Sequence, residues 1–201
     1  MVITATQVKA LRDITAAGFM ECKAALTEAE GDLDKAVTIL RTRGQAKAVK
    51  RAGRTTAHGL VGHYIHPGGK VGVLVEVNCE TDFVARTEDF QGLVKEIAMH
   101  IAAANPLYAK REEVPTDELN NERDIYRAQF KDSDKPAAII DKIVEGKISS
   151  YYEQIVLPDQ PSIRDPKTSI GELVQVAIAK FGENIAVSRF TRFKVGETDE
   201  Q

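Results

Sequence analysis

The feature that most constrains the fold is a pair of strand-forming segments, residues 59–66 and 70–79, on either side of a Pro-Gly-Gly turn. Valine, isoleucine, leucine and tyrosine dominate both segments, and such side chains suit a pleated, half-buried surface. A proline followed by two glycines readily adopts the backbone angles of a tight turn. The chain is therefore predicted to contain an antiparallel β-hairpin.

The residues before this hairpin, 1–44, are predicted to form three short helices. Thr4 and Gln7 fit a capping box, and Asp32 is a candidate N-cap of the third helix. Arginines occupy the last turn of that helix and Gly44 follows them, which predicts that the helix ends there. A helical unit of this size buries little core by itself, so we expect a small domain attached to a larger one.

Residues 45–57 carry a local excess of positive charge, on Lys47, Lys50, Arg51 and Arg54. The whole chain has a formal net charge of −3, with 27 lysine and arginine residues against 30 acidic ones, which argues against nonspecific nucleic-acid binding by the whole molecule. We interpret the stretch as a solvated linker or half-helix and expect no direct nucleic-acid contact. A local contact with RNA or phosphate is the alternative.

After the hairpin, the sequence predicts a long helix. Thr87 is a candidate N-cap, and Asn105 followed by Pro106 stops the helix. His100 lies beside the apolar face and is interpreted as a structural histidine. Apolar residues at helical spacing form the predicted core stripe: Phe90, Val94, Ile97 and Ile101.

Two charged amphipathic segments between Asp117 and Ile155 are joined by a short polar loop. They predict an antiparallel helical hairpin that projects from the body as an interaction arm, and packing back on the core is the alternative. Ser169 and Glu172 form a second capping-box pattern, which begins another helix, and residues 183–197 supply a final strand or two.

The order of these segments predicts an α+β fold, in which helices pack on an antiparallel sheet and a small helical head precedes it. The predicted domains are a three-helix domain at residues 1–44, a basic linker at 45–57 and an α+β core at 58–201. The core includes the hairpin arm at about 117–155.

Motifs for small-molecule catalysis are missing from the sequence. It contains no phosphate-binding Gly-rich loop, no dinucleotide fingerprint and no nucleophile elbow. His63 and His66 stand three apart on a strand and therefore point to opposite faces, so we expect no metal site there. Cys22 and Cys79 are interpreted as small buried hydrophobes. We expect no cofactor, no metal and no active site.

The sequence also contains no apolar run of membrane-spanning length and no charged-then-apolar leader. We therefore expect neither a membrane span nor a secretion signal. These expectations together favour a cytoplasmic protein.

Phe83 is an apolar residue that the core pattern does not require. It follows Asp82 directly, where the second strand gives way to polar residues. Phe90 is in register with the core stripe, whereas Phe83 precedes the cap at Thr87. Two interpretations are therefore open at this point: Phe83 is an ordinary core residue of the next element, or its side chain is presented outward to a partner.

Several separated segments resemble the elongation factor Ts family of bacteria and organelles, in the right order over essentially the whole chain. They are VKALRDITAAGFMECKAALTEAEGDLDKAV at 8–37, EVNCETDFVAR at 76–86, EIAMHIAA at 96–103 and NIAVSRFTRFKVGE at 184–197. The segment at 76–86 is the most specific. The resemblance implies a guanine-nucleotide exchange factor for elongation factor Tu, with a ubiquitin-associated-like domain at the N-terminus.

The resemblance also implies roles for individual residues. Thr81, Asp82, Phe83 and Val84 match a segment that presses against the GTPase domain of elongation factor Tu. In the family, the phenylalanine enters a pocket between helices of that domain, and the resulting shift dislodges the bound Mg²⁺.

Further contacts are implied for the head and the hairpin. Arg12, Phe19 and Met20 match the part that grips the GTPase domain, although relatives often have two methionines in place of Phe19-Met20. His66 matches a hairpin histidine that, in relatives, approaches the phosphate-binding side.

This chain resembles the short form of the family, because it has a single hairpin where longer members carry a duplicated core. A single half leaves one sheet face uncovered, which a second copy could bury. We therefore expect a homodimer and a two-to-two assembly with elongation factor Tu. The competing interpretations are a noncatalytic binding module that recruits an acceptor protein through its head, an RNA-binding factor that uses residues 47–54, and a small-molecule enzyme.

Overall fold

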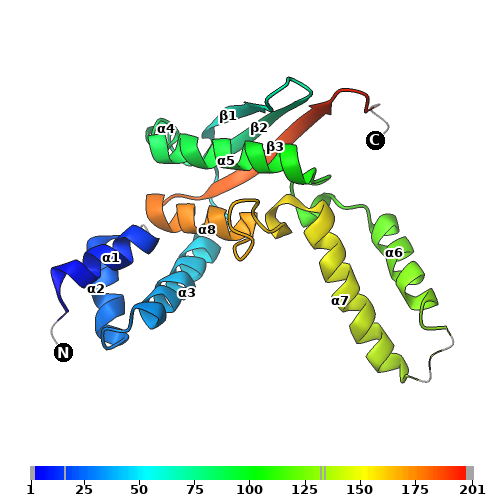
Figure 1. Ribbon diagram of the computed structural model, residues 1–201, viewed down its shortest axis with the longest axis horizontal. Helices are drawn as coiled ribbons and strands as arrows, with labels where there is room; N and C mark the ends of the chain where they lie inside the picture. The colour runs from blue at the N-terminus through cyan, green and yellow to red at the C-terminus, as the bar shows by residue number, and fades with distance from the viewer. Residues whose placement is uncertain (1–2, 16, 132, 134, 198–201) are drawn as a thin grey trace. The chain divides into compact units, whose positions relative to one another are not determined.

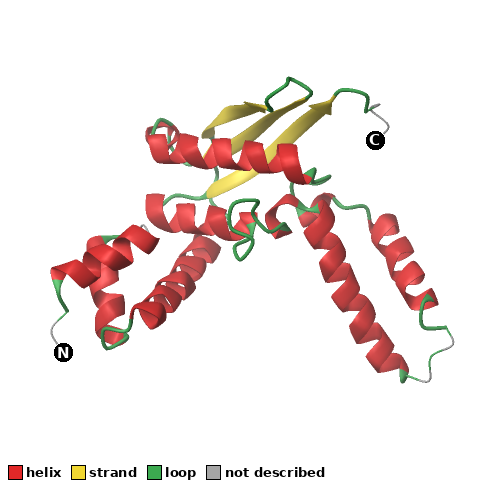
Figure 2. Cartoon of the chain, viewed as in Figure 1, coloured by secondary structure: helices red, strands yellow, loops and turns green. Residues whose placement is uncertain are grey.

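The computed structural model describes residues 3–15, 17–131, 133 and 135–197. The chain forms two compact units. The first comprises residues up to Val61 together with Glu76–Leu93 and Leu173–Val187, and the second comprises Gly62–Val75, Val94–Glu172 and the residues from Ser188 on. The helices and the sheet in the described residues confirm the α+β class (Figures 1 and 2).

The sheet consists of β1 (His58–Ile65), β2 (Val71–Cys79) and β3 (Ile185–Lys194), with β2 in the centre. The predicted hairpin is confirmed as β1 and β2, and the His66 amide donates to the Val71 carbonyl, 2.9 Å away, at its turn. Strand β3 runs antiparallel to β2, since the amide of Val195, just after β3, donates to the carbonyl of Lys70, just before β2. Alternate residues of β2 are buried in the core: Val73, Val75, Val77 and Cys79.

The helical head consists of α1 (Ala5–Thr15), α2 (Phe19–Glu28) and α3 (Leu33–Arg51) (Figure 1). Residues from each of these helices meet in one apolar cluster: Val8, Leu11, Cys22, Ala25, Leu26, Ala36 and Leu40. The predicted caps are present. The Gln7 amide donates to Thr4 Oγ1 and the Thr4 amide to Gln7 Oε1, while Asp32 accepts a hydrogen bond from the Lys35 amide at 3.0 Å.

The prediction that the third helix ends at Gly44 is wrong, because α3 continues to Arg51. Residues 45–51 consist of alanine, glutamine, lysine, arginine and a valine, and most of these favour a helix enough to outweigh the cost of a single glycine. Ala48 is buried, and a side chain at Gly44 would touch Ala179 of the same unit. Much of the predicted basic linker is therefore helix.

Acidic partners neutralise part of this basic stretch. Lys47 forms an ion pair with Glu21 of α2, and Arg54 lies 3.6 Å from a carboxylate oxygen of Glu80. A surface that binds RNA presents its cations to phosphates instead. The pairing favours the interpretation of this stretch as a structural segment.

Helix α5 (Glu88–Ala104) begins as predicted, with the Phe90 amide donating to Thr87 Oγ1 at 3.2 Å. Its core stripe is confirmed, since these residues are all buried: Phe90, Val94, Ile97 and Ile101. Gly62 of β1 permits close approach to α5, because a Cβ there would lie 2.2 Å from Val94 Cγ1. In the first unit, Phe90 packs edge-on against Phe181, with ring centroids 6.2 Å apart.

Helix α8 (Ile170–Phe181) begins with the predicted capping box. The Glu172 amide donates to Ser169 Oγ, and the Ser169 amide donates to a Glu172 carboxylate oxygen. Gly182, with φ of 75°, ends the helix and turns the chain toward β3.

Two further helices, α6 (Thr116–Ala128) and α7 (Ala137–Ile155), pack against each other as the predicted helical hairpin (Figure 1). Arg123 pairs with Glu145 and Arg127 with Asp141 between them. The 3₁₀ turns Arg111–Glu113 and Leu157–Asp159 lie at the base of this pair.

Hydrogen bonds to Glu118 fix the base of this hairpin. Its carboxylate accepts hydrogen bonds from the hydroxyls of Tyr108 and Tyr151, each at 2.7 Å. Burial, followed by the hydrogen bond to Glu118, raises the pKa of Tyr108 to about 12. Glu118 thus links the start of α6 to Tyr151 near the end of α7 and to Tyr108 before α6.

No helix in the described part of the chain is both long and apolar enough to cross a membrane. The described residues also contain no cluster of histidine, cysteine and acidic side chains that could hold a metal ion.

His100 is buried in the second unit, as the structural interpretation predicts. The side-chain amide of Gln160 donates to the Gln154 carbonyl, so its oxygen faces His100 Nε2 at 2.9 Å and Nε2 is the donor. Among the described residues no group hydrogen-bonds Nδ1. Burial lowers the pKa of His100, while Gln160 and the nearby charge of Glu96 oppose this shift. The fold therefore favours the neutral imidazole.

This arrangement predicts a pH-dependent stability. The folded-state pKa of His100 lies below its unfolded value near 6.5, so the unfolded state binds more protons as pH falls below that value. The free energy of unfolding, measured with urea between pH 7.5 and pH 5, should fall on acidification in wild type. This loss should be smaller in His100→Leu and unchanged in His63→Asn, an exposed histidine of β1. An equal loss in wild type and His100→Leu would contradict the assignment.

Candidate functional site

The Thr81–Val84 segment lies immediately after β2 and forms most of a one-turn helix, α4 (Asp82–Ala85). Thr81 has extended backbone angles and precedes the helix. Phe83 is 79% exposed, more than any other large apolar side chain in the described residues. The prediction that Phe83 points outward is confirmed, and its role as a contact is a separate question.

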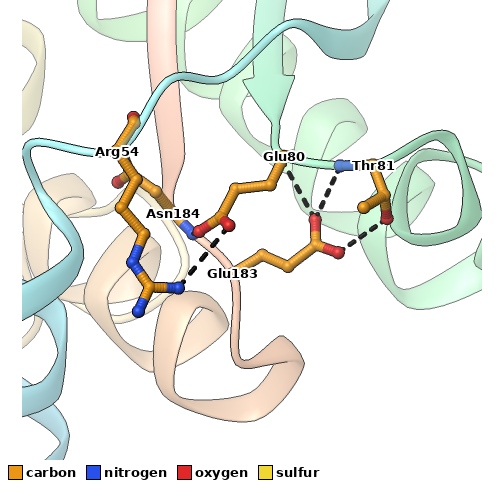
Figure 3. A network of polar contacts seen from close by, with 5 residues as sticks. All are labelled: Arg54, Glu80, Thr81, Glu183 and Asn184. Atoms are coloured by element: carbon orange, nitrogen blue, oxygen red, sulfur yellow. Dashed lines mark hydrogen bonds and ion pairs between the residues drawn. The ribbon is translucent and has the colours of Figure 1, made fainter.

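Glu183 holds the entry to this turn (Figure 3). It lies just after α8, 103 residues along the chain from Glu80. One of its carboxylate oxygens accepts hydrogen bonds from the amides of Glu80 and Thr81, at 3.1 and 3.0 Å. The other accepts the Thr81 hydroxyl at 2.6 Å. Hydrogen bonds to a charged acceptor are stronger than neutral ones, so this carboxylate is a firm anchor.

Glu80, in turn, accepts a hydrogen bond from the segment that carries Glu183. Its carboxylate accepts the Asn184 amide at 2.7 Å and lies 3.6 Å from the guanidinium of Arg54. The Asn184 side chain is buried and donates to the Arg54 carbonyl at 2.8 Å. The end of β2, the start of β3 and the chain after α3 are thereby joined in one network (Figure 3).

The exit of the turn is held by the start of α5. The Thr87 hydroxyl donates to the Val84 carbonyl at 2.8 Å, and Ala85 is buried. Both ends of the segment are therefore fixed, while the side chain between them faces solvent.

Cys79, the last residue of β2, also contacts this turn. It is buried, and its thiol donates to the Thr81 carbonyl at 3.1 Å. Burial, and then the negative charge of Glu183, raise the pKa of the Cys79 thiol, so it stays protonated. Cys22 is also buried, which confirms the interpretation of both cysteines as small buried residues.

Asp82 forms an ion pair with Arg86, one turn later, at 2.7 Å. The Arg86 side chain is 78% exposed and the Asp82 side chain 44%, and such surface pairs contribute about 0–1 kcal/mol. A binding partner could therefore replace Arg86 as the contact of Asp82 at small cost.

The head residues singled out by the resemblance are exposed on the first unit. Phe19 and Met20 open α2, and Arg12 lies in the last turn of α1. The structure adds Ile14, which is 61% exposed. The sequence pattern missed it because its spacing of three from Leu11 is equally compatible with the core face.

His66 is exposed at the β1–β2 turn and belongs to the second unit. Its Nδ1 lies 3.2 Å from the Tyr64 hydroxyl. The site that the structure assembles thus consists of Thr81–Val84 with Glu183 and Asn184, and the last two were not found from the sequence. No local pattern could reveal them, because their significance lies in contacts with a distant segment.

These features define an α+β module in which the most exposed large apolar side chain of the described residues stands on an anchored turn. A protein-family model described as Elongation factor TS matches residues 5–197. The chain belongs to the elongation factor Ts family.

Curated relatives agree over nearly the whole length. The chain is 56% identical to elongation factor Ts of Citrifermentans bemidjiense over 197 residues, which cover 98% of this chain and 91% of the relative. It is 55% identical to elongation factor Ts of Geobacter sulfurreducens with the same coverage. It is also 55% identical to that of Fervidobacterium nodosum, with 98% and 100% covered. Family membership implies a translation elongation factor, and an exchange factor rather than a catalytic enzyme.

The difference in burial between Phe83 and Phe90 predicts that their substitution changes stability by very different amounts. Phe83→Ala should change the free energy of unfolding by less than about 0.5 kcal/mol, since the ring is mostly solvated. Phe90→Ala removes a fully buried ring and should lower it by about 3–5 kcal/mol. Urea unfolding followed by circular dichroism measures both values. A large loss in Phe83→Ala would mean that its ring packs in solution.

Proposed function

We propose that the chain promotes release of GDP from elongation factor Tu, and that Asp82 and Phe83 perform this step. Flanked by Thr81 and Val84, they enter the GTPase domain and displace its Mg²⁺. The observation that carries the proposal is the 79% exposure of Phe83 on a turn whose main chain is fixed at both ends. The proposed setting is translation in the cytoplasm.

The physical basis is competition for the groups that hold GDP. Amides of the phosphate-binding loop and Mg²⁺ together bind the nucleotide phosphates. Because coupling between two ligands is reciprocal, a factor that lowers the affinity for GDP must itself bind less tightly to the GDP form. Burial of a Phe ring at an interface supplies about 1.5–3 kcal/mol. At about 1.4 kcal/mol per factor of ten, Phe83 accounts for one or two factors of ten in release rate.

Other contacts supply affinity that Phe83 does not. We assign the grip on the GTPase domain to Arg12, Phe19 and Met20 of the helical head, and include Ile14 because of its exposure. His66 at the hairpin turn is assigned to the phosphate-binding side of the partner. We also propose that the helical head is a ubiquitin-associated-like domain.

The proposal predicts that Phe83→Ala accelerates GDP release about ten- to a hundredfold less than wild type, from the burial energy of one ring. Stopped-flow release of fluorescent GDP from elongation factor Tu measures this rate. Ile163→Ala is a matched control, since it truncates an exposed apolar residue elsewhere.

Wild-type rates in Phe83→Ala would rule out the mechanism. If wild type bound elongation factor Tu without accelerating release, the noncatalytic binding module would be the better interpretation.

We further propose that two copies associate through an apolar patch of the second unit. Ile65, Leu74, Phe193 and Val195 are exposed and line a hollow of about 410 Å³ beside β2. An exposed apolar patch on a sheet face favours protein contact. A second copy presents the same patch, so that a two-fold arrangement covers both.

Sedimentation should therefore show a dimer of the 22.1 kDa chain at micromolar concentration. Phe193→Glu places a charge in each half of the contact and should shift the population toward monomer, because unpaired buried charges are costly. Ile139→Glu, at an exposed position of α7, is the control and should stay dimeric. A wild-type protein that sediments only as monomer would refute the dimer.

A further inference from the structure

The Thr81–Val84 turn has little means of holding itself in place. A helix of four residues has few internal hydrogen bonds, and isolated short helices are unstable in water. Phe83 adds no packing, because its ring faces solvent. The direction in which Phe83 points is therefore decided by the contacts at the two ends of the turn.

The contacts at its exit belong to the general architecture of α5, whereas those at its entry come from Glu183, with one further hydrogen bond from the Cys79 thiol at the end of β2. Thr87 caps α5 by accepting the Phe90 amide, and the same hydroxyl donates to the Val84 carbonyl. Glu183 instead reaches from the α8–β3 connection and contacts the turn at both Thr81 amide and Thr81 hydroxyl. Gly182, with its φ of 75°, ends α8 just before Glu183.

The surrounding hydrogen bonds hold the segment that carries the Glu183 carboxylate in place. The main-chain amide of Asn184 donates to the Glu80 carboxylate, and the main-chain amide of Glu80 donates to the Glu183 carboxylate (Figure 3). Each carboxylate therefore accepts a hydrogen bond from the segment that carries the other. A displacement of either strand end breaks hydrogen bonds in both directions. The entry to the turn is thus set by a long-range pair of reciprocal bonds.

We propose that Glu183 is a positioning residue for nucleotide exchange, which holds the main chain at Glu80 and Thr81 so that Phe83 is presented in the orientation that the GTPase accepts. The inference rests on the proposed function of Phe83. Glu183 acts through the turn and makes no contact with the partner itself.

The test compares Glu183→Ala and Glu183→Gln in the fluorescent-GDP release assay, with the exchange factor varied to saturation. Glu183→Ala should lower the maximal release rate about tenfold, the effect expected from losing charge-assisted hydrogen bonds at a functional turn. The concentration for half-maximal rate should change less, because the head contacts are intact. Glu183→Gln keeps an oxygen for the two amides and should restore most of the rate.

Glu113 provides a matched control. Its carboxylate oxygen accepts the amides of Ala109 and Lys110, at 2.9 and 3.3 Å, in the second unit. Glu113→Ala removes the same kind of contact without touching the Phe83 turn. It should leave the maximal release rate unchanged.

A double-mutant cycle with Phe83→Ala shows whether Glu183 acts through the phenylalanine. In a Phe83→Ala background, Glu183→Ala should cause little further loss. Equal losses in both backgrounds, or a wild-type rate in folded Glu183→Ala, would overturn the inference. If Phe83→Ala itself exchanged like wild type, the proposed function would fail instead.

Should Glu183→Ala prove unfolded by circular dichroism, Thr81→Val takes its place in the same cycle. It removes only the 2.6 Å hydroxyl bond to Glu183. The inference is supported if Thr81→Val lowers the maximal release rate in the wild-type protein and causes little further loss in the Phe83→Ala variant. It is overturned if Thr81→Val leaves the wild-type rate unchanged or lowers the rate equally in both proteins.

Discussion

The exposed turn depends on the hydrogen bonds between the Glu183 carboxylate and the main chain at Glu80 and Thr81. The sheet brings these segments together, since β3 lies beside β2 and starts where β2 ends. A carboxylate in a half-buried position binds such amides more strongly than a neutral group does. The presentation of Phe83 is thus a consequence of the strand order.

Short-range devices explain why much of the fold could be predicted from the sequence. The Thr4–Gln7 and Ser169–Glu172 capping boxes each act within four residues, and the structure contains both. The spacing of Phe90, Val94 and Ile97 defined a buried helical face, which is confirmed. For Phe83, its position ahead of the cap at Thr87, outside that helix, was the informative signal, and the family resemblance then identified the segment as a site.

What could not be predicted has both local and long-range causes. Gly44 looked like a helix end, but the helix-favouring residues after it and a buried Ala48 continue α3. The one-turn helix α4 is too short to show a period. Glu183 follows Gly182 as an ordinary turn residue in sequence, and only pairing across 102 residues gives it a contact with Thr81. Such pairing depends on the strand order, which the local patterns of a single sequence do not reveal.

In the proposed mechanism, the anchored turn also affects how much of the burial energy of Phe83 is available to weaken the binding of GDP. Ordering the backbone of a flexible segment costs about 1–2 kcal/mol per residue. A loose Thr81–Val84 loop would incur that cost on contact with its partner, and it would cancel the gain from burying Phe83. In this fold the cost is met during folding, by the bonds to Glu183 at the entry and Thr87 at the exit. In the proposed exchange mechanism, the burial energy of the ring then remains available to oppose GDP, which is why an exposed aromatic residue would be useful here only on a rigid support.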